Sequence, residues 1–326
     1  MPECFIIQPI HEAGLDRLRQ GGIVPRRASA QDANTVMREV GGAEAVITRN
    51  AGFRAPEIDA APRLRVVCNH GVGMNAIDVA HATALGIAVV NTPGANGRSV
   101  AEHAIALMLA LARRVVDADA AVRAEDWRLR YEARMMQMQC KVLGLVGFGS
   151  IGRMTGGIAR HGFGMELLVF SPGSDDAGLA AAGARRAHSL HALLAEADVV
   201  SLHRPLRPDT RHCIDAAALA CMRPHALLVN TARAELIDGA ALAACLHAGR
   251  IGGAALDVFR VEPPLVAEDP LLSTPRTLLA PHIAGVTEDA MRETALACAS
   301  QVLDVLAGRR PQHLLRPEMW DLRRGA

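Results

Sequence analysis

The chain has 326 residues, with 35 Lys and Arg against 34 Asp and Glu, and half of its residues are hydrophobic. This length exceeds the usual size of a single hydrophobic core, and the composition argues against long disordered segments. A formal net charge of +1 excludes the concentrated positive charge with which proteins bind nucleic acids or anionic membranes, so a small molecule is the expected partner.

The start of the chain and its cysteines indicate the compartment. The segment MPECFIIQPIHEAG has no basic stretch ahead of an apolar core, unlike a secretory signal. The seven cysteines are scattered and form no C-x-x-C pair, so neither a disulfide framework nor a metal site is expected. The most apolar stretch, 104–112, is about half as long as a membrane span and is expected to be a buried helix. We expect a cytoplasmic protein.

Short apolar runs alternate with Ala-rich amphipathic segments, a pattern typical of repeated βα units and parallel sheets. A long helical stretch, roughly 99–124, follows the loop NTPGANG and separates two groups of such units. Another long helix is expected over 286–306. The expected strands are FIIQPI (5–10), AEAVIT (43–48), LRVVCN (64–69), IAVVN (87–91), KVLGLVG (141–147), MELLVF (165–170), ADVVSLH (197–203), ALLVNT (226–231) and IGGAALDVF (251–259).

The segment VLGLVGFGSIGR is the strongest local motif. Gly147, Gly149 and Gly152 form G-x-G-x-x-G directly after an expected strand and at the start of an expected helix. The first glycine permits a tight turn, the second lets the backbone approach a pyrophosphate, and the third allows the helix to pack closely on the strand. The motif and its context predict a dinucleotide-binding fold.

The choice between NAD and NADP stays open at this stage, although NAD is the default expectation. An acidic residue about 20 positions after the motif usually binds the ribose 2′-hydroxyl of NAD, and Ser171 stands there. Arg204 could favour a 2′-phosphate or could be an ordinary surface residue. Asp175 and Asp176 argue mildly against NADP.

Two other dehydrogenase classes are disfavoured. The only tyrosine, Tyr131, is followed by EARM and lacks the lysine of a Y-x-x-x-K motif. A zinc enzyme would need Cys and His ligands, but His188 and His191 have no companions at metal spacing, so no metal is expected.

Three segments that each follow an expected strand carry one reactive group each: Arg233, Glu262 and His282. Residues just past the carboxyl ends of strands converge on the ligand crevice of a doubly wound sheet. Hydride transfer to a 2-oxo acid leaves negative charge on the carbonyl oxygen, which an imidazolium such as His282 can neutralise. Glu262 would favour that imidazolium, and Arg233 could hold the substrate carboxylate in a bidentate manner.

Seven segments in this order give the chain a close resemblance to the D-isomer-specific 2-hydroxyacid dehydrogenase family, which includes phosphoglycerate, glyoxylate and hydroxypyruvate enzymes. The segments are NHGVGMNAID, NTPGANGRSVAEHA, VGFGSIG, HRPL, NTARAELID, ALDVFRVEPP and APHIAG. The resemblance implies two Rossmann-like, doubly wound parallel-sheet α/β domains, a substrate domain (1–98 and 286–326) and an inserted dinucleotide-binding domain (99–285). It also implies a homodimer formed through the long helix and the arm that includes Trp127.

By the same resemblance, His282 is the acid/base, Glu262 its partner and Arg233 the substrate-orienting residue. The expected substrate contacts are Asn69, Val72 and Gly73. The expected cofactor contacts are Val100, Gly147, Gly149, Ser150, Ile151, Gly152, Ser171, His203, Arg204, Pro205, Thr210, Thr231, Ala232, Asp257 and Gly285.

The chain departs from the family pattern at several positions. Ala234 and Cys140 replace frequent glycines without removing a reacting group. The segment ITRNAG differs from that of phosphoglycerate enzymes, which puts a phosphorylated substrate in doubt.

Two alternatives remain. A formate-type or phosphite-type dehydrogenase is disfavoured because the formate enzymes carry glutamine where this chain has Glu262. A dinucleotide-sensing binding protein without turnover is the other alternative.

Overall fold

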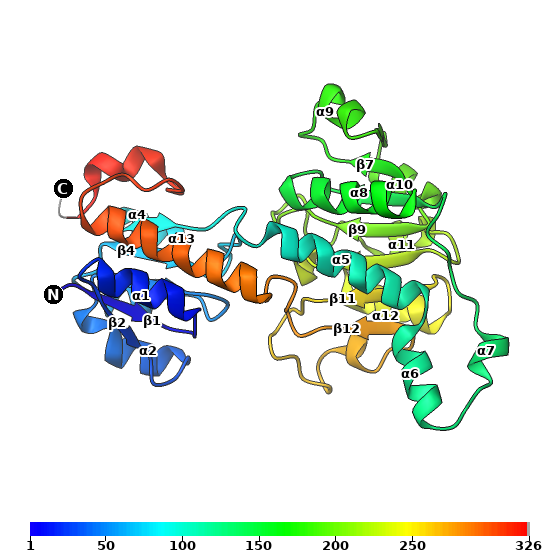
Figure 1. The fold of residues 1–326 in the computed structure, drawn as a ribbon, viewed down its shortest axis with the longest axis horizontal. Coiled ribbons are helices and arrows are strands. Elements are labelled where there is room, and N and C mark those ends of the chain that lie inside the picture. Colours follow the sequence, from blue (N-terminus) through cyan, green and yellow to red (C-terminus); the bar gives the residue numbers. More distant parts are fainter. Residues whose placement is uncertain (325–326) are drawn as a thin grey trace. The chain divides into compact units, whose positions relative to one another are not determined.

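A computed structural model describes residues 1–324 of the chain. It divides into two compact units, which Figure 1 shows and which are described separately below. The amino-terminal unit comprises Met1–Asn96 and the segment from Val286 onward, and the central unit comprises Gly97–Gly285. The chain therefore leaves the first unit, forms the second and returns.

The amino-terminal unit is a five-stranded parallel sheet in the order β2-β1-β3-β4-β5, with α13 returning from the end of the chain to pack on α1 and β4. Its strands are β1 (Glu3–Ile6), β2 (Val24–Arg27), β3 (Ala45–Thr48), β4 (Val66–Asn69) and β5 (Ala88–Val90). Its helices are α1 (Glu12–Gln20), α2 (Ala33–Glu39), α3 (Ala55–Asp59), α4 (Val79–Ala84) and α13 (Glu288–Leu306), with short 3₁₀ turns η1 (Val40–Gly42) and η4 (Pro317–Leu322).

The central unit is a seven-stranded parallel sheet in the order β12-β11-β10-β9-β6-β7-β8. Its strands are β6 (Val142–Val146), β7 (Glu166–Phe170), β8 (Ala184–Arg186), β9 (Val199–Leu202), β10 (Leu227–Asn230), β11 (Gly253–Leu256) and β12 (Thr277–Leu279). Its helices are α5 (Gly97–Ala112), α6 (Val115–Arg123), α7 (Leu129–Glu132), α8 (Ser150–Phe163), α9 (Asp176–Ala181), α10 (Leu190–Glu196), α11 (Ala216–Cys221) and α12 (Gly239–His247), with 3₁₀ turns η2 (Ala234–Leu236) and η3 (Pro270–Leu272).

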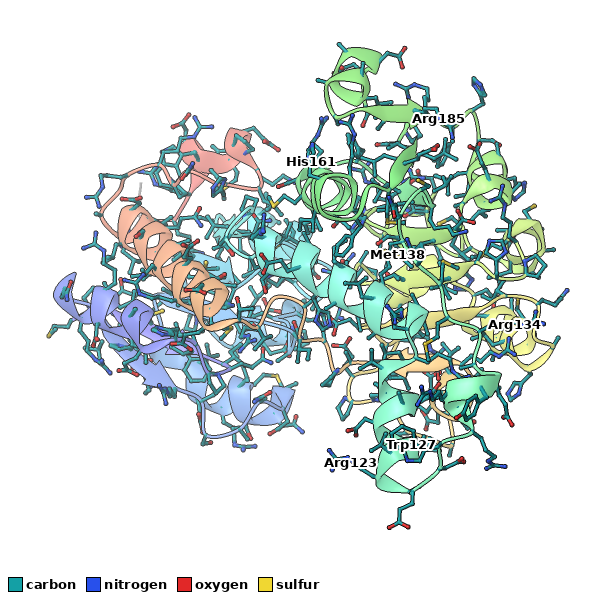
Figure 2. All side chains as sticks on the ribbon, turned by 45° about the vertical axis from the view of Figure 1, so that its right-hand side comes forward. Arg123, Trp127, Arg134, Met138, His161 and Arg185 are labelled. Carbon is teal, nitrogen blue, oxygen red and sulfur yellow. The ribbon has the colours of Figure 1, made fainter. Side chains whose placement is uncertain are left out.

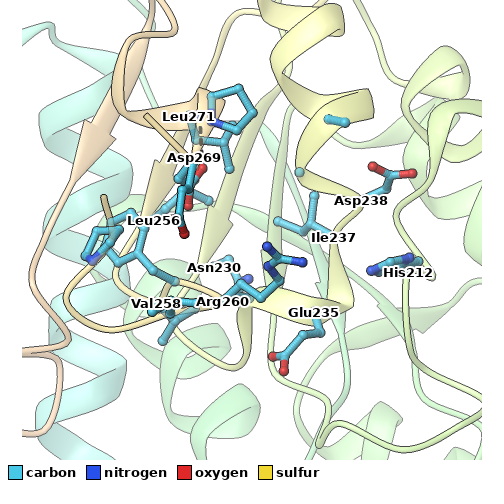
Figure 3. Close-up of a pocket in the computed structure, with 18 of the residues that line it drawn as sticks. His212, Asn230, Glu235, Ile237, Asp238, Leu256, Val258, Arg260, Asp269 and Leu271 are labelled. Carbon is cyan, nitrogen blue, oxygen red and sulfur yellow. Dashed lines mark hydrogen bonds between the residues drawn. The ribbon is translucent and has the colours of Figure 1, made fainter. Parts of the chain in front are cut away.

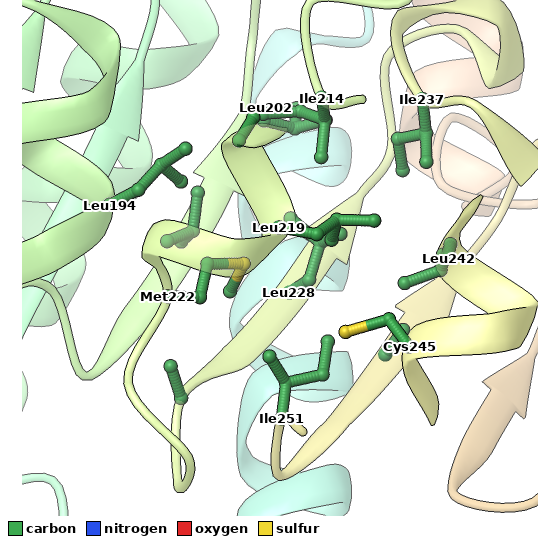
Figure 4. Packing of buried hydrophobic residues seen from close by; sticks show 14 of the residues in the cluster. Leu194, Leu202, Ile214, Leu219, Met222, Leu228, Ile237, Leu242, Cys245 and Ile251 are labelled. Carbon is green, nitrogen blue, oxygen red and sulfur yellow. The ribbon is translucent and has the colours of Figure 1, made fainter. Parts of the chain in front are cut away.

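Apolar side chains cover both faces of the central sheet, as a parallel sheet requires. One buried cluster joins the sheet to α10, α11 and α12, and Figure 4 shows Leu194, Leu219, Leu228 and Ile251 packed within it. A second cluster joins the other face to α5 and α8. The expected two-sheet α/β fold is confirmed. The short apolar runs form its interior strands, because such a strand has side chains buried on both faces of the sheet.

Several expected bounds were wrong. The first strand is Glu3–Ile6, not 5–10, and the run 251–259 contributes only Gly253–Leu256 to the sheet. Three strands are missing from the expected set, β2 (VPRR), β8 (ARR) and β12 (TLL). All three are short edge strands without a buried residue, so they lack the buried apolar run by which an interior strand is recognised.

The single helix expected over roughly 99–124 is also wrong, because the structure forms two helices there, α5 and α6. α5 ends at Ala112, and Arg114 takes a left-handed conformation with φ of 50° before α6 begins. Nine residues of α5 are buried, whereas α6 buries none. The chain turns where the sheet no longer supplies an apolar surface. The last long helix begins at Glu288, with Thr287 accepting a hydrogen bond from the Ala290 amide.

The structure also bears on membrane and metal binding. Among residues 1–324, no helix combines the length and the apolarity that crossing a bilayer requires. In the same residues no group of His, Cys, Asp and Glu side chains is arranged to hold a metal ion. All seven cysteines are free thiols.

Candidate active site

Most of the expected site residues of the central unit lie in loops that directly follow strands of its sheet. Gly147 follows β6, Ser171 follows β7 and His203 follows β9. Thr231 follows β10 and Asp257 follows β11. Because the strands are parallel, their carboxyl ends share one edge, where a doubly wound sheet binds its ligand.

The first and third glycines of the motif stand where a side chain would collide with the backbone. Gly147 has φ of +101°, and a Cβ atom there would lie 2.7 Å from the His203 carbonyl oxygen. A Cβ atom on Gly152 would lie 2.5 Å from the Gly147 carbonyl oxygen. Gly149 caps α8 without a side-chain hydrogen bond and faces open space. The first amides of α8 therefore point into a cradle that suits a phosphate group.

The end of β7 carries hydroxyl groups in place of a carboxylate. The Ser171 and Ser174 hydroxyl oxygens lie 3.0 Å apart. The two nearby acids are already engaged, since Asp175 accepts a hydrogen bond from the Gly178 amide and Asp176 pairs with Arg186 at 2.6 Å. Both carboxylates thus have protein partners, and neither is left over to bind a ribose hydroxyl group.

The loop after β9 begins with an imidazole, that of His203, followed by the cation of Arg204. The Arg204 guanidinium lies 5.9 Å from the Phe170 ring and pairs with the exposed Asp209 at 3.3 Å. Burial lowers the pKa of His203 to about 4, so its ring is neutral at pH 7. The Thr210 hydroxyl donates to the Pro205 carbonyl oxygen at 2.8 Å and accepts from the Arg207 amide, which folds the loop on itself.

The loop after β10 presents Arg233. Asn230 is almost wholly buried, and its amide nitrogen donates to the Arg233 carbonyl oxygen at 2.8 Å. Its amide oxygen accepts from the Ala232 amide at 3.0 Å. Burial lowers the pKa of Arg233, while the charges of Glu235 and Glu262 act in the opposite direction. The neighbouring Thr231 hydroxyl is buried and has no hydrogen-bond partner among the described residues.

Glu262 and His282 form a direct pair. The Glu262 Oε2 atom lies 2.7 Å from Nδ1 of His282, and its Oε1 atom accepts from the Phe259 amide at 3.2 Å. Burial raises the pKa of Glu262, but the hydrogen bond and charge of His282, the Phe259 amide and Arg233 together bring it below its ordinary value. Glu262 is therefore ionised at pH 7 and interacts electrostatically with His282 and Arg233. The structure brings together all three groups that the sequence singles out.

The loop that carries His282 is fastened by a buried carboxylate. Asp257 has no exposed surface, and its two oxygens accept from the Ile283 and Ala284 amides, each at 2.9 Å. The Ser99 hydroxyl donates to the Ala284 carbonyl oxygen at 2.7 Å, and Nε2 of His103 lies 3.5 Å from Asp257. His282 itself has φ of +55°, an uncommon conformation for a residue other than glycine.

The sequence does not identify Asp257 and Ser99 as fasteners of this loop, because their partners are backbone groups that no motif records. Asp257 was expected only as a cofactor contact. Val100, also expected to contact the cofactor, lies beside Ser99 on α5 and is 7% exposed. Gly285, the last residue of the central unit, follows the fastened loop.

The amino-terminal unit holds the remaining expected residues in the loop after β4. The buried Asn69 donates to the Gly73 carbonyl oxygen at 2.7 Å, and Asn91 donates to the Val72 carbonyl oxygen at 2.9 Å. The Thr92 hydroxyl accepts from the Gly71 amide at 3.0 Å. Among the described residues, the Val72 and Gly73 amides have no acceptor.

The fold and the glycine cradle define a dinucleotide-binding α/β protein. Residues 105–284 match the model for the D-isomer specific 2-hydroxyacid dehydrogenase, NAD binding domain. This match covers more than half of the chain, and the chain therefore belongs to the D-isomer-specific 2-hydroxyacid dehydrogenase family. The resemblance stated from the sequence is confirmed, as is a nicotinamide dinucleotide as the cofactor.

Named relatives include metabolic reductases and dehydrogenases. The chain is 34% identical over 328 residues to a glyoxylate reductase of Korarchaeum cryptofilum, covering 99% of this chain and 98% of that protein. It is 36% identical over 309 residues to a D-3-phosphoglycerate dehydrogenase of Synechocystis sp., covering 94% of this chain but only 55% of that protein. This chain thus spans about half the length of such relatives.

A solved structure aligns over the whole chain. It is an NADPH-dependent glyoxylate/hydroxypyruvate reductase from Sinorhizobium meliloti in complex with NADP and malonate. The TM-score is 0.85 at 27% identity, and the alignment covers 100% of this chain and 99% of that one.

Proposed function

We propose that the protein interconverts a small D-2-hydroxy acid and its 2-oxo acid with NAD(P)(H), with Arg233, Glu262 and His282 as the catalytic residues. The hydrogen bond of 2.7 Å between His282 and Glu262, within the electrostatic reach of Arg233, carries this proposal. Family membership and the glyoxylate reductase relative support the same reaction class.

His282 is suited to move a proton at the substrate oxygen. The ionised Glu262 accepts a hydrogen bond from Nδ1–H of His282. The other ring nitrogen, Nε2, is therefore the one that gives or takes a proton. The hydrogen bond to the carboxylate also fixes the orientation of the ring. When bound, the reduced nicotinamide supplies the hydride that reaches the 2-carbon of the oxo acid, and the Nε2 proton neutralises the oxygen.

Arg233 is suited to hold the substrate. Its guanidinium offers a planar fork of donors to a carboxylate and can polarise the neighbouring carbonyl group. In the amino-terminal unit, we assign the Val72 and Gly73 amides to a carboxylate as well, because both are donors without an acceptor among the described residues.

We infer that the cofactor cradle accepts NADPH at least as well as NADH. Ser171 and Ser174 offer hydroxyl donors at the end of β7, and Arg204 offers a cation near Phe170. Because Asp176 is paired with Arg186, its charge repels a 2′-phosphate less than the sequence suggests. A Ser171→Asp variant should therefore lower the ratio of kcat/KM for NADPH to that for NADH by at least about tenfold. An unchanged ratio would contradict the assignment.

We propose that the protein is a homodimer joined through the arm formed by α6 and α7. The arm exposes Val116, Trp127 and Tyr131, with 61% of Trp127 accessible, and such clustered apolar side chains mark interaction surfaces. Figure 2 shows Arg123 and Trp127 together at the end of the arm. Sedimentation velocity should find a dimer for the wild type and a monomer for the double variant Trp127→Glu/Tyr131→Glu. Val24→Glu, in the amino-terminal unit, is the control and should remain dimeric.

A single spectrophotometric panel tests the proposed reaction. Glyoxylate, hydroxypyruvate, pyruvate and about seven further 2-oxo acids are offered with NADH and with NADPH, beside formate and phosphite with the oxidised cofactors. We expect turnover with at least one 2-oxo acid and none with formate or phosphite. Binding of NADPH without turnover of any substrate would support a dinucleotide-sensing protein instead.

A further inference from the structure

A cavity of about 310 Å³ lies in the central unit behind the two loops that carry Arg233 and Glu262. Its walls come from η2 and the start of α12 on one side and from the loop 258–271 on the other. Figure 3 shows it in close-up. Neither Arg233, Glu262 nor His282 lines it, and none of the glycines of the phosphate cradle does. It therefore adjoins the site described above and shares Asn230, Glu235 and Phe259 with it, but contains none of its three proposed catalytic groups.

The floor of the cavity is apolar. Ile237, Leu256 and Leu271 are buried side chains that line it, and Val258 and Phe259 add further apolar surface. Its volume is at the lower end of the range of about 300 to 1,000 Å³ typical of small-molecule pockets. The cavity fits a compact apolar group better than a nucleotide.

The rim of the cavity is acidic. Four carboxylates line it, those of Glu235, Asp238, Glu268 and Asp269, against the single guanidinium of Arg260. Asp238 and Asp269 each use one oxygen to accept a backbone amide, at 3.1 Å from Ala241 and 3.0 Å from Leu271. Among the described residues, the other carboxylate oxygen of each has no hydrogen-bond partner. Figure 3 shows Glu235, Asp238 and Asp269 spaced around Arg260.

We propose that this cavity is a second ligand site, which binds a primary amine carried on a compact apolar body. An ammonium group would meet the excess of carboxylate charge at the rim, and the apolar body would displace water from Ile237, Leu256 and Leu271. An anionic ligand of the same shape is excluded by the same charge. This chemistry is opposite to that of the 2-oxo acid substrate, so the two sites select different molecules.

Glu235 couples this second site to the first one. Its charge acts on Arg233, two residues earlier in the chain, while its side chain lines the cavity. An ammonium group beside Glu235 offsets that negative charge, so the field at Arg233 becomes more positive and favours an anionic substrate. Bound amine should therefore lower KM for the 2-oxo acid. This part of the inference rests on the proposed function, whereas amine binding does not.

Calorimetric titration of the NADPH-loaded protein tests the binding. The probe is 2-phenylethylamine, with 2-phenylethanol as the neutral control and phenylacetate as the anionic one. We expect saturable binding of one amine per chain, affinity at least about tenfold lower for the alcohol, and no binding of the acid at the same concentrations. Equal binding of all three probes, or saturable binding of none, would overturn the proposal.

A matched pair of variants locates the binding. Ala240 and Ala244 are both exposed on α12, but only Ala240, at the start of the helix, lines the cavity. Ala240→Trp should fill the cavity and abolish amine binding, and Ala244→Trp should leave it unchanged. Both variants should retain basal turnover within about twofold, because neither residue belongs to the catalytic set. Amine binding that survives in Ala240→Trp would place the amine elsewhere.

Kinetics with and without the amine test the coupling. Saturating 2-phenylethylamine should lower KM for the 2-oxo acid about two- to tenfold in the wild type and in Ala244→Trp, with no effect in Ala240→Trp. In Glu235→Gln, the amine should bind more weakly and no longer change KM. Binding that leaves KM unchanged would overturn the coupling through Glu235.

Discussion

Two loops of this protein follow parallel strands, β4 and β12, and each is held in place by a buried polar side chain, but they use their backbone amides in opposite ways. After β4, Asn69 binds the carbonyl oxygen of Gly73, and the Val72 and Gly73 amides stay without an acceptor among the described residues. After β12, Asp257 takes up the Ile283 and Ala284 amides.

The difference lies in the fastening group. A side-chain amide can donate to a carbonyl oxygen, which leaves the loop's own N–H groups available for an anion. An ionised carboxylate only accepts hydrogen bonds, so it binds the N–H groups of the loop. The group that this loop offers to a ligand is then a side chain, that of His282. On the proposed function, one loop serves as a binding surface and the other supports the proposed acid/base residue. The following predictions test that comparison.

Removing the presented side chain should have the largest effect. His282→Ala should lower kcat by about 10²- to 10⁴-fold, because general acid catalysis supplies about that much. NADPH affinity should stay nearly unchanged, since the glycine cradle is untouched. Steady-state kinetics and fluorescence titration of NADPH measure both. Wild-type turnover in His282→Ala would refute the acid/base role.

Loosening the support should have the next largest effect. Asp257→Asn presents at most one acceptor to two amides and leaves one of them facing an N–H₂ group, so His282 loses its position. We expect kcat to fall by up to about 10²-fold, the loss that a misplacement of about 1 Å can cause. Ser99→Ala, which removes only one hydrogen bond to the Ala284 carbonyl oxygen, is the matched control and should fall by less than about tenfold. Equal losses in both variants would contradict the role of the carboxylate.

Loosening the binding loop should change KM more than kcat. Asn69→Ala removes the hydrogen bond to Gly73 and should raise KM for the 2-oxo acid about tenfold, because the two free amides are no longer held in place. kcat should change by less than about threefold. A fall in kcat with KM unchanged would show that this loop serves the chemical step instead.

The smallest effect concerns stability and pH. The pKa of Glu262 is lowered in the folded protein from its ordinary value of 4.5, so its pair with His282 contributes stability above that value and loses it as pH falls through the lowered pKa. At pH 7, Glu262→Gln should lower the free energy of unfolding by at most about 1 kcal/mol, since the pair is partly exposed to solvent. Thermal melts should show a small Tm difference at pH 7 that vanishes in acid. A difference that grows in acid would contradict this sign.

Much of the site follows from local patterns. The spacing of the glycines predicts the turn from Gly147 to Gly152, because only glycine fits where a Cβ atom would lie within 3 Å of a carbonyl oxygen. The alignment of Arg233, Glu262 and His282 after successive strands is also predictable, since parallel strands bring their carboxyl ends to one edge.

The amino-acid sequence by itself determined the α/β class and the dinucleotide turn, and it singled out the three proposed catalytic groups, because each depends on residue type at a fixed local spacing. Tertiary structure alone decided that Asp257 fastens the His282 loop, that Asp175 and Asp176 are engaged elsewhere, and that the helix expected over 99–124 turns at Arg114. These outcomes depend on which groups meet across the fold. Contacts between residues far apart in the chain produce no repeating pattern in the sequence, so no local motif predicts them.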